Sequence, residues 1–252
     1  MREASNDSDT AFVPWHRWDR NFFLWFVFAA WIATGFGFYP SVSERFTGQP
    51  DYVAPLVLQL HVFAFTGWLC LLSLQVLLVR TGRQWVHQRL GLLAAILIPV
   101  MMVTAIGAEI ASQRFYSAKY PENLRFFISP VSSVALFAVF GVMAILQRRQ
   151  PAAHKRLILL ATTVVLSAAY NRWWGEALYA LFGDGYAGMV IHNYAGIDLI
   201  LVLLVAYDWV TRRRIHAVYQ WGVPLIFITQ LIGTFIYHSE MWPGIVRRLV
   251  GL

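Results

Sequence analysis

The feature that most constrains this chain is a series of long apolar segments separated by short polar turns. These segments are approximately 22–40, 55–79, 90–111, 127–147, 156–174, 189–210 and 221–240. At 1.5 Å per residue, a helix of about 20 residues crosses a hydrocarbon core roughly 30 Å thick. We therefore predict an all-α polytopic membrane protein, with seven transmembrane helices in a single domain over residues 1–252.

Composition supports the same class and excludes a water-soluble domain. Hydrophobic residues make up 58% of the chain, charged residues only 13%, and the mean hydropathy is +0.55. The sequence pI of about 9.8 is high enough to suggest nucleic acid as a partner for a soluble chain. Here the basic residues lie in turns beside the bilayer, so we interpret them as orientation signals that attract anionic lipid, with no nucleic-acid partner.

The distribution of basic residues predicts the orientation of the chain. Of the 20 Lys and Arg residues, 13 fall on the side that holds the N-terminus and 7 on the other side. The larger group comprises Arg2, Arg17, Arg20, Arg80, Arg83, Arg89, Arg148, Arg149, Lys155, Arg156, Arg212, Arg213 and Arg214. Because cytoplasmic loops carry the excess of basic residues, we predict a cytoplasmic N-terminus and a C-terminus outside.

One short phrase recurs along the chain. It reads "VHQRLGLL" at 86–93 and "AHKRLILL" at 153–160, and a weaker copy, "IHAVYQWG", stands at 215–222. Each copy lies where the chain turns back into the membrane from the predicted cytoplasmic side. The pattern predicts one helix followed by three helical hairpins that form internal repeats of about sixty residues.

The residues of the repeated phrase have a simple structural interpretation. Arg89, Lys155 and Arg156 are predicted to reach lipid phosphates. His87, His154 and His216 lie at helix N-termini, where the helix dipole opposes an added positive charge, so we expect them to be neutral and hydrogen-bonded to the loops. A metal site or proton relay at the cytoplasmic face is the alternative.

Two segments outside the spans are predicted to lie at the membrane interface. Residues 175–188, "GEALYALFGDGYAG", are expected to form a short helix that ends at the Gly-Asp-Gly turn. The tail "WPGIVRRLVGL", 242–252, is expected to lie along the interface or to contact a partner subunit.

A second set of histidines lies within the predicted helices, near their outer ends. His61, His192 and His238 share this depth on three different helices. Other polar residues at the same level are Glu109, Asn171, Arg172, Asn193 and Glu240. Polar and ionisable side chains at membrane depth are costly and generally face the bundle interior or a water-filled cavity. The sequence therefore predicts a polar cavity near the outer leaflet.

Three chemistries fit this predicted cavity. In the first, which we favour, two of the histidines His61, His192 and His238, from different helices, ligate a haem iron axially or bind copper or iron. Arg172 and Asn171 are the cofactor-binding residues, and the site serves membrane redox work linked to a quinone. In the second, the three histidines hold zinc and Glu109 acts as the catalytic base of a hydrolase for lipid or amide bonds. In the third, no metal is bound, and the residues serve a proton-coupled transporter or an accessory subunit of a larger membrane complex.

The motifs also carry a family resemblance. The stretches "LHVFAFTGW", "VHQRLG", "RRQPAAHKRLILLAT" and "AYDWVTRRRIH" are similar to those of a broad group of bacterial seven-helix integral membrane proteins to which no activity is assigned. The matching region spans roughly residues 52–222 and includes His61, Gln75, His87 and His154. This resemblance implies a multi-pass protein of the bacterial inner membrane. His238 lies outside the matching region.

Overall fold

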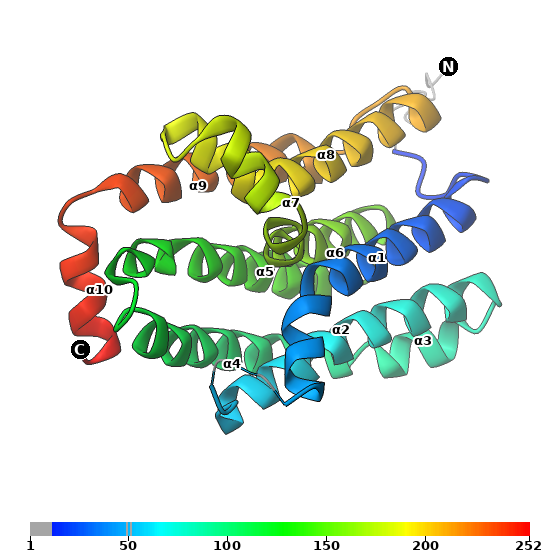
Figure 1. The fold of residues 1–252 in the computed structure, drawn as a ribbon. Helices are drawn as coiled ribbons and strands as arrows, with labels where there is room; N and C mark the ends of the chain where they lie inside the picture. Colours follow the sequence, from blue (N-terminus) through cyan, green and yellow to red (C-terminus); the bar gives the residue numbers. More distant parts are fainter. Residues whose placement is uncertain (1–11, 49, 51) are drawn as a thin grey trace, which may run out of the picture.

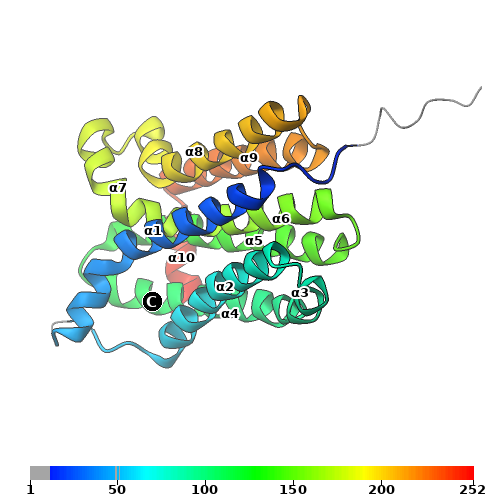
Figure 2. The same ribbon diagram turned by 90° about the vertical axis from the view of Figure 1, so that its right-hand side faces the viewer.

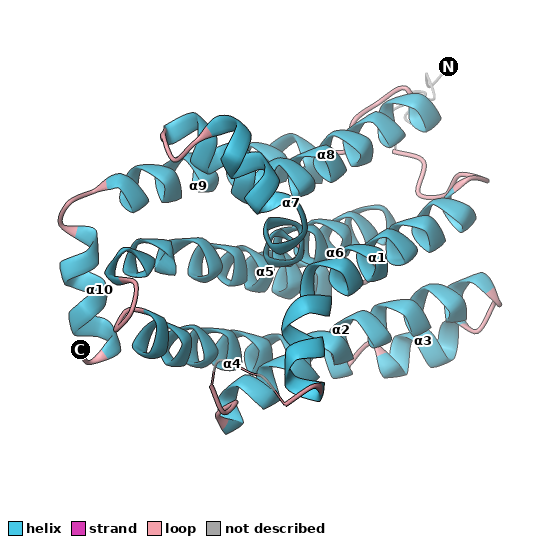
Figure 3. Ribbon diagram, in the orientation of Figure 1, coloured by secondary structure: helices cyan, strands magenta, loops and turns pink. Residues whose placement is uncertain are grey.

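The computed structural model describes residues 12–48, 50 and 52–252, and the described part is built of helices and short loops without strands (Figures 1 and 3). The elements are α1 (Asp19–Phe46), α2 (Leu56–Arg80), α3 (Gln84–Leu90), α4 (Leu93–Tyr116), the 3-10 helix η2 (Pro121–Phe127), α5 (Ile128–Leu146), α6 (Pro151–Val165), α7 (Ser167–Phe182), α8 (Tyr186–Arg212), α9 (Ala217–His238) and α10 (Trp242–Val250). The predicted all-α class is confirmed for these residues. Arg2, one of the basic residues used to predict orientation, lies outside them.

Six helices or helix pairs are long and apolar enough to cross a membrane, and the number is seven if the bent pair α6 and α7 crosses as one span. In each of the six, only 28–44% of the most apolar 18-residue window is buried within the protein. The remaining apolar surface includes Trp25, Phe28, Phe63 and Val103, all more than half exposed. Lipid chains are the environment in which such a surface is stable, so the chain is a multi-pass membrane protein.

The three predicted hairpins pack as three layers. Within them, α2 contacts α4, α5 contacts α6, and α8 contacts α9. The hairpin of α5 and α6 lies in the middle, since α5 contacts both α4 and α9, while α1 runs across the front of the layers in Figure 2. We call the end of the bundle where α1 begins the N-terminal end, and the end crossed by α10 the C-terminal end (Figure 1).

The fifth predicted span, 156–174, is not one straight helix. The chain bends by 43° at Leu166, between α6 and α7. The predicted separate helix at 175–188 is wrong, because α7 continues without a break through Phe182. The new direction lays α7 along α8, where Tyr170 packs so closely on Gly196 that an added Cβ there would stand 2.2 Å from the aromatic ring.

Close contact between backbones also joins α1 to α7. A Cβ added at Gly37 would stand 2.3 Å from the carbonyl oxygen of Ala169. In lipid, hydrophobic burial does not drive helices together, so small residues that let helices approach closely supply the attraction through packing. Gly37 therefore fixes the crossing of α1 and α7.

The C-terminal tail forms an amphipathic helix across the C-terminal end of the bundle (Figure 1). On α10, Val246 and Val250 are fully buried against Leu124 and Phe127 of η2. The backbone of Val250 also accepts a hydrogen bond from Arg114 of α4. The tail is therefore packed onto its own chain.

Candidate functional site

Four polar side chains from three membrane helices gather in the C-terminal half of the bundle. We call them the C-end cluster: His61 on α2, Glu109 and Gln113 on α4, and Arg172 on α7. Gln113 donates a hydrogen bond from Nε2 to Glu109 Oε1 at 2.7 Å. Arg172 lies within electrostatic reach of both Glu109 and His61, but no ion pair within 4.0 Å joins it to Glu109 in the described structure.

Two polar atoms of the C-end cluster are buried and have no hydrogen-bond partner. They are Nδ1 of His61 and Oε1 of Gln113. Gln113 is only 4% exposed, and the His61 ring packs against Phe65 with 4.2 Å between ring centres. Native proteins leave few buried polar groups unpaired, and those that remain are commonly partners for water, an ion or a ligand. The cluster therefore has the polar groups of a binding site.

The backbone of α7 positions Arg172 toward α1. Its guanidinium donates to the carbonyl oxygen of Ala168 at 2.9 Å and lies over the ring of Phe38, 4.9 Å from the centroid. Phe38 follows Gly37, where the backbones of α1 and α7 are in close contact. Small residues at the crossing thus bring a cation from one helix against an aromatic face of the other.

Asn171 and His192, predicted as cofactor and metal ligands, lie between α7 and α8 and not in the C-end cluster. Asn171 donates from Nδ2 to Asn193 Oδ1 at 3.0 Å and to the backbone oxygen of His192 at 3.3 Å. The ring of His192 stands edge-on to Tyr179 at 5.7 Å. The Asn171 side chain therefore joins two helices.

His238, the third predicted metal ligand, lies at the end of α9. Its Nδ1 is 2.8 Å from the carbonyl oxygen of Thr234, and its Nε2 is 3.0 Å from that of Asp184. The ring also stacks on Tyr186 with 4.1 Å between centres. Because a carbonyl oxygen lies within 3.0 Å of each ring nitrogen, the directions from which a metal ion would bind the ring are occupied.

The three predicted histidine ligands are thus distributed over three different environments. Among the residues described, no group of three or more His, Cys, Asp or Glu side chains is arranged to hold a metal ion. Of the predicted site residues, His61, Glu109 and Arg172 lie in the C-end cluster, Asn171 contacts the backbone of His192, and His238 lies apart from both groups. Haem ligation by His61 stays a prediction.

The sequence reading overlooked an acidic residue within the membrane. Asp198 lies near the middle of α8 and accepts a hydrogen bond from Gln230 Nε2 of α9 at 2.8 Å. The signal was present, because the Asp interrupts the apolar run "IDLILVLLVAY". Intramembrane carboxylates are expensive and commonly functional.

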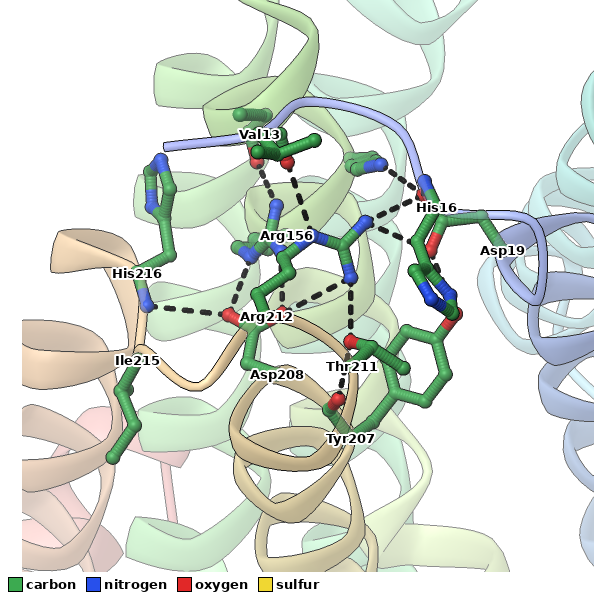
Figure 4. A network of polar contacts seen from close by, with 12 residues as sticks. Val13, His16, Asp19, Arg156, Tyr207, Asp208, Thr211, Arg212, Ile215 and His216 are labelled. Atoms are coloured by element: carbon green, nitrogen blue, oxygen red, sulfur yellow. Dashed lines mark hydrogen bonds and ion pairs between the residues drawn. The ribbon is translucent and has the colours of Figure 1, made fainter. Parts of the chain in front are cut away.

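The N-terminal end of the bundle holds a second set of charged residues, which Figure 4 shows. We call Asp19, Lys155, Arg156, Tyr207, Asp208 and Arg212 the N-end network. Asp19 is only 2% exposed, and its carboxylate accepts from Lys155 at 2.6 Å, Arg212 at 2.7 Å and Tyr207 at 2.7 Å. One carboxylate therefore joins α1, α6 and α8.

The second buried carboxylate of the N-end network is that of Asp208, which is 1% exposed. Arg156 binds it through two nitrogens, with Nε donating at 2.8 Å and Nη2 donating to the other oxygen. The backbone N–H of His216 also donates to Asp208, at 3.2 Å. The prediction that Lys155 and Arg156 reach lipid phosphates is wrong, because both bind buried carboxylates instead.

The segment before α1 is bound to the N-end network. Arg212 donates to the backbone oxygen of Val13 at 3.0 Å, and Lys155 donates to that of Pro14. The ring of Phe12 covers the guanidinium of Arg156 at 4.4 Å (the region is drawn in Figure 4). The network thus closes this end of the bundle under the N-terminal segment.

His216, in the third copy of the repeated phrase, caps α9. Its Nδ1 accepts a hydrogen bond from the backbone N–H of Val218 at 3.1 Å. Burial, and then the nearby Arg156 guanidinium, lower the pKa of His216 from 6.5 to about 4. The residue is therefore neutral at pH 7, as its place at a helix N-terminus predicts.

Comparisons with family models, with curated proteins and with solved structures find no match to this chain. We therefore infer the function from the arrangement of the residues described above. The two ends of the bundle differ in one respect that bears on it: the N-end network is paired, whereas the C-end cluster contains unpaired buried polar atoms.

Proposed function

We propose that this protein is a membrane transporter that couples a proton to a small anion at the C-end cluster. The observation that carries the proposal is that Arg172 lies within electrostatic reach of Glu109 and of His61, so that three membrane helices contribute ionisable groups beside two unpartnered buried atoms. Ionisable groups at membrane depth generally mark the path of an ion or substrate. The proposal includes seven spans, a cytoplasmic N-terminus and a bacterial inner membrane, which would place the cluster in the outer half of the bilayer.

The mechanism follows from the charges of Glu109 and Arg172. When Glu109 is ionised, it balances Arg172 and the cluster is neutral. When Glu109 takes up a proton, Arg172 loses its counter-charge and attracts an anion, which makes the cluster neutral again. Because an isolated charge within a membrane is costly, these two neutral loading states are favoured over the charged ones. One proton would therefore accompany one monovalent anion.

The remaining side chains suit recognition of the anion. A guanidinium presents several N–H donors in a fixed plane that matches a carboxylate or phosphate. His61 Nδ1 would add a donor beside it, while Gln113, which donates to Glu109, would hold that carboxylate in place. Asp198, deeper in the membrane on α8, offers a second carboxylate to a transported proton.

The metal hypotheses have less geometric support at this cluster. A zinc hydrolase needs three protein ligands around the ion. The described residues contain no such group, and His238 faces carbonyl oxygens with both nitrogens. Glu109 lies beside Gln113 and Arg172, an arrangement that suits a proton acceptor with a balancing cation.

The test is transport in vesicles. The purified chain is reconstituted into liposomes, and uptake of radiolabelled acetate, lactate and phosphate is measured with and without a pH gradient. We expect at least one anion to accumulate when the outside is acidic. Glu109→Gln mimics the protonated carboxyl, so it should keep anion exchange but lose accumulation driven by the pH gradient. Arg172→Gln should lose both activities.

Glu176→Gln is the matched control, because Glu176 is an exposed carboxylate one turn beyond Arg172 on the same helix. This variant should transport like the unmodified chain. Uptake no faster than in protein-free vesicles for all three anions would contradict the proposal. Equal anion accumulation driven by the pH gradient in Glu109→Gln and Glu176→Gln would also contradict the proposal.

A further inference from the structure

The repeated phrase brings two histidines together at the N-terminal end of the bundle. His87 on α3 and His154 on α6 occupy the same position in the first two copies of the phrase, "VHQRLGLL" and "AHKRLILL". Their ring centres are 6.3 Å apart and the ring planes are nearly perpendicular, at 87°. Neither residue belongs to the N-end network or to the C-end cluster. The pair therefore needs an explanation of its own.

The hydrogen bond of His154 determines which of its nitrogens is basic. Its Nδ1 lies 2.8 Å from the carbonyl oxygen of Ala144. A carbonyl oxygen only accepts, so Nδ1 carries the proton and the lone pair of the neutral ring is on Nε2. Histidines that bind metals are commonly fixed in this way, with the other ring nitrogen donating to a backbone carbonyl.

His87 has a buried ring nitrogen without a partner. Its Nδ1 makes no hydrogen bond and is shielded from solvent, and the same is true of Oε1 of the neighbouring Gln75. Gln75 holds the α3 backbone by donating from Nε2 to the carbonyl oxygen of His87 at 3.1 Å. Buried polar atoms without partners suggest that an ion or water completes this site.

We propose that His87 and His154 form a two-histidine site for monovalent copper. A metal bound to nitrogen at roughly 2.0 Å on each side places two imidazole centres about 6 Å apart when the nitrogens oppose each other. The observed separation is 6.3 Å. A neutral His87 can present either nitrogen, since imidazole has two tautomers.

The number and type of ligands select the metal. Imidazole binds zinc, copper, iron and nickel. No third His, Cys, Asp or Glu of the described chain joins the pair in a group able to hold a metal. Zinc almost always takes four ligands in a structural site and three protein ligands in a catalytic one. Monovalent copper is stable with two nitrogen ligands in line, and it adds only one positive charge.

The test is copper binding by the full chain in mild detergent without oxygen. Monovalent copper is titrated in competition with the coloured chelator bicinchoninate, and the expected result is one ion per chain. His87→Ala and His154→Ala should each weaken binding by more than about 100-fold, since removal of a ligand should exceed the effect of losing a supporting partner. X-ray absorption of the loaded protein should show two nitrogen neighbours.

His216→Ala is the matched control, because His216 occupies the same place in the third copy of the phrase and caps α9 instead. It should bind copper like the unmodified chain. If an alanine variant does not yield a folded protein, His87→Gln and His154→Gln keep the size and polarity of the side chains. Absence of copper binding by the unmodified chain, or binding that all four variants at His87 and His154 retain, would overturn the proposal. Neither result depends on the transport measurement.

Discussion

The two ends of the bundle use charged residues in opposite ways. In the N-end network, both carboxylates are almost fully buried and each contacts at least one cation directly. In the C-end cluster, Arg172 and Glu109 interact without touching, and two buried polar atoms have no partner. Paired charges hold helices together, whereas unpaired polar groups can form hydrogen bonds with a ligand. We therefore assign a structural role to the N-end network and propose a binding role for the C-end cluster.

The largest effect is expected on breaking the N-end network. Asp208→Ala leaves the guanidinium of Arg156 buried without its carboxylate, and loss of one partner of a buried pair costs about 3–5 kcal/mol. Thermal unfolding in mild detergent measures the change. Glu44→Ala, at an exposed position of α1, should stay within about 0.5 kcal/mol of the unmodified chain. Equal losses of unfolding free energy in Asp208→Ala and Glu44→Ala would contradict the structural role of the N-end network.

A smaller loss is expected for Asp19→Asn. The amide keeps the shape of the side chain but weakens the bonds to Lys155, Arg212 and Tyr207, and hydrogen bonds to a charged group contribute about 1.5–3 kcal/mol. The segment that precedes α1 should loosen, so trypsin should cleave faster after Arg17. Mass spectrometry of timed digests measures this rate. An unchanged rate would show that the network does not hold the segment.

Gly37→Ala tests whether close helix contact positions the C-end cluster. The new Cβ would stand 2.3 Å from the backbone oxygen of Ala169, so α1 and α7 must separate. Overpacking of this kind costs about 1–3 kcal/mol. Anion uptake should fall as well, because Arg172 lies against Phe38 at the same crossing. Gly35→Ala, with no atom within 4 Å of its added Cβ, should change neither property.

His61→Leu distinguishes the two ends most directly. It removes a ring whose Nδ1 is buried without a partner, so the unfolding free energy should change by less than about 1 kcal/mol. Anion uptake should nevertheless be lost. The melting temperature and the uptake rate are measured on the same preparation. A large loss of stability with normal uptake would reverse the assignment of the two ends.

The last effect, confined to acidic pH, is a pH dependence at His216. Its pKa is about 4 in the folded chain, below the ordinary 6.5, so the unfolded chain binds more protons between these values. The stabilising contribution is complete above pH 6.5 and is lost as the pH falls toward 4. His216→Ser keeps a side-chain acceptor for Val218 at the helix N-terminus and should flatten this part of the stability profile. Identical profiles of stability against pH for His216→Ser and the unmodified chain would contradict this contribution of His216.

The sequence predicted the helices well and the contacts poorly. Segments such as 55–79 and 189–210 lie within one to three residues of the ends of α2 and α8, because apolar length alone specifies a span. The bend at Leu166 was not foreseen, since no proline or glycine stands at residues 160–170 to mark it. Lys155 and Arg156 were assigned to lipid because a basic residue at a membrane turn carries no local sign of a distant carboxylate.

What the sequence by itself determined is the class of the protein, the approximate spans and the position of each polar residue along its span, because a helix needs about 20 apolar residues to cross a bilayer. The tertiary structure alone decided which residues at equal depth meet. It grouped His61 with Glu109 and Arg172 but kept His192 and His238 apart, and it brought His87 to His154. Which side chains come into contact depends on the rotation of each helix about its axis and on close packing at small residues such as Gly37. Both are determined by the neighbouring helices.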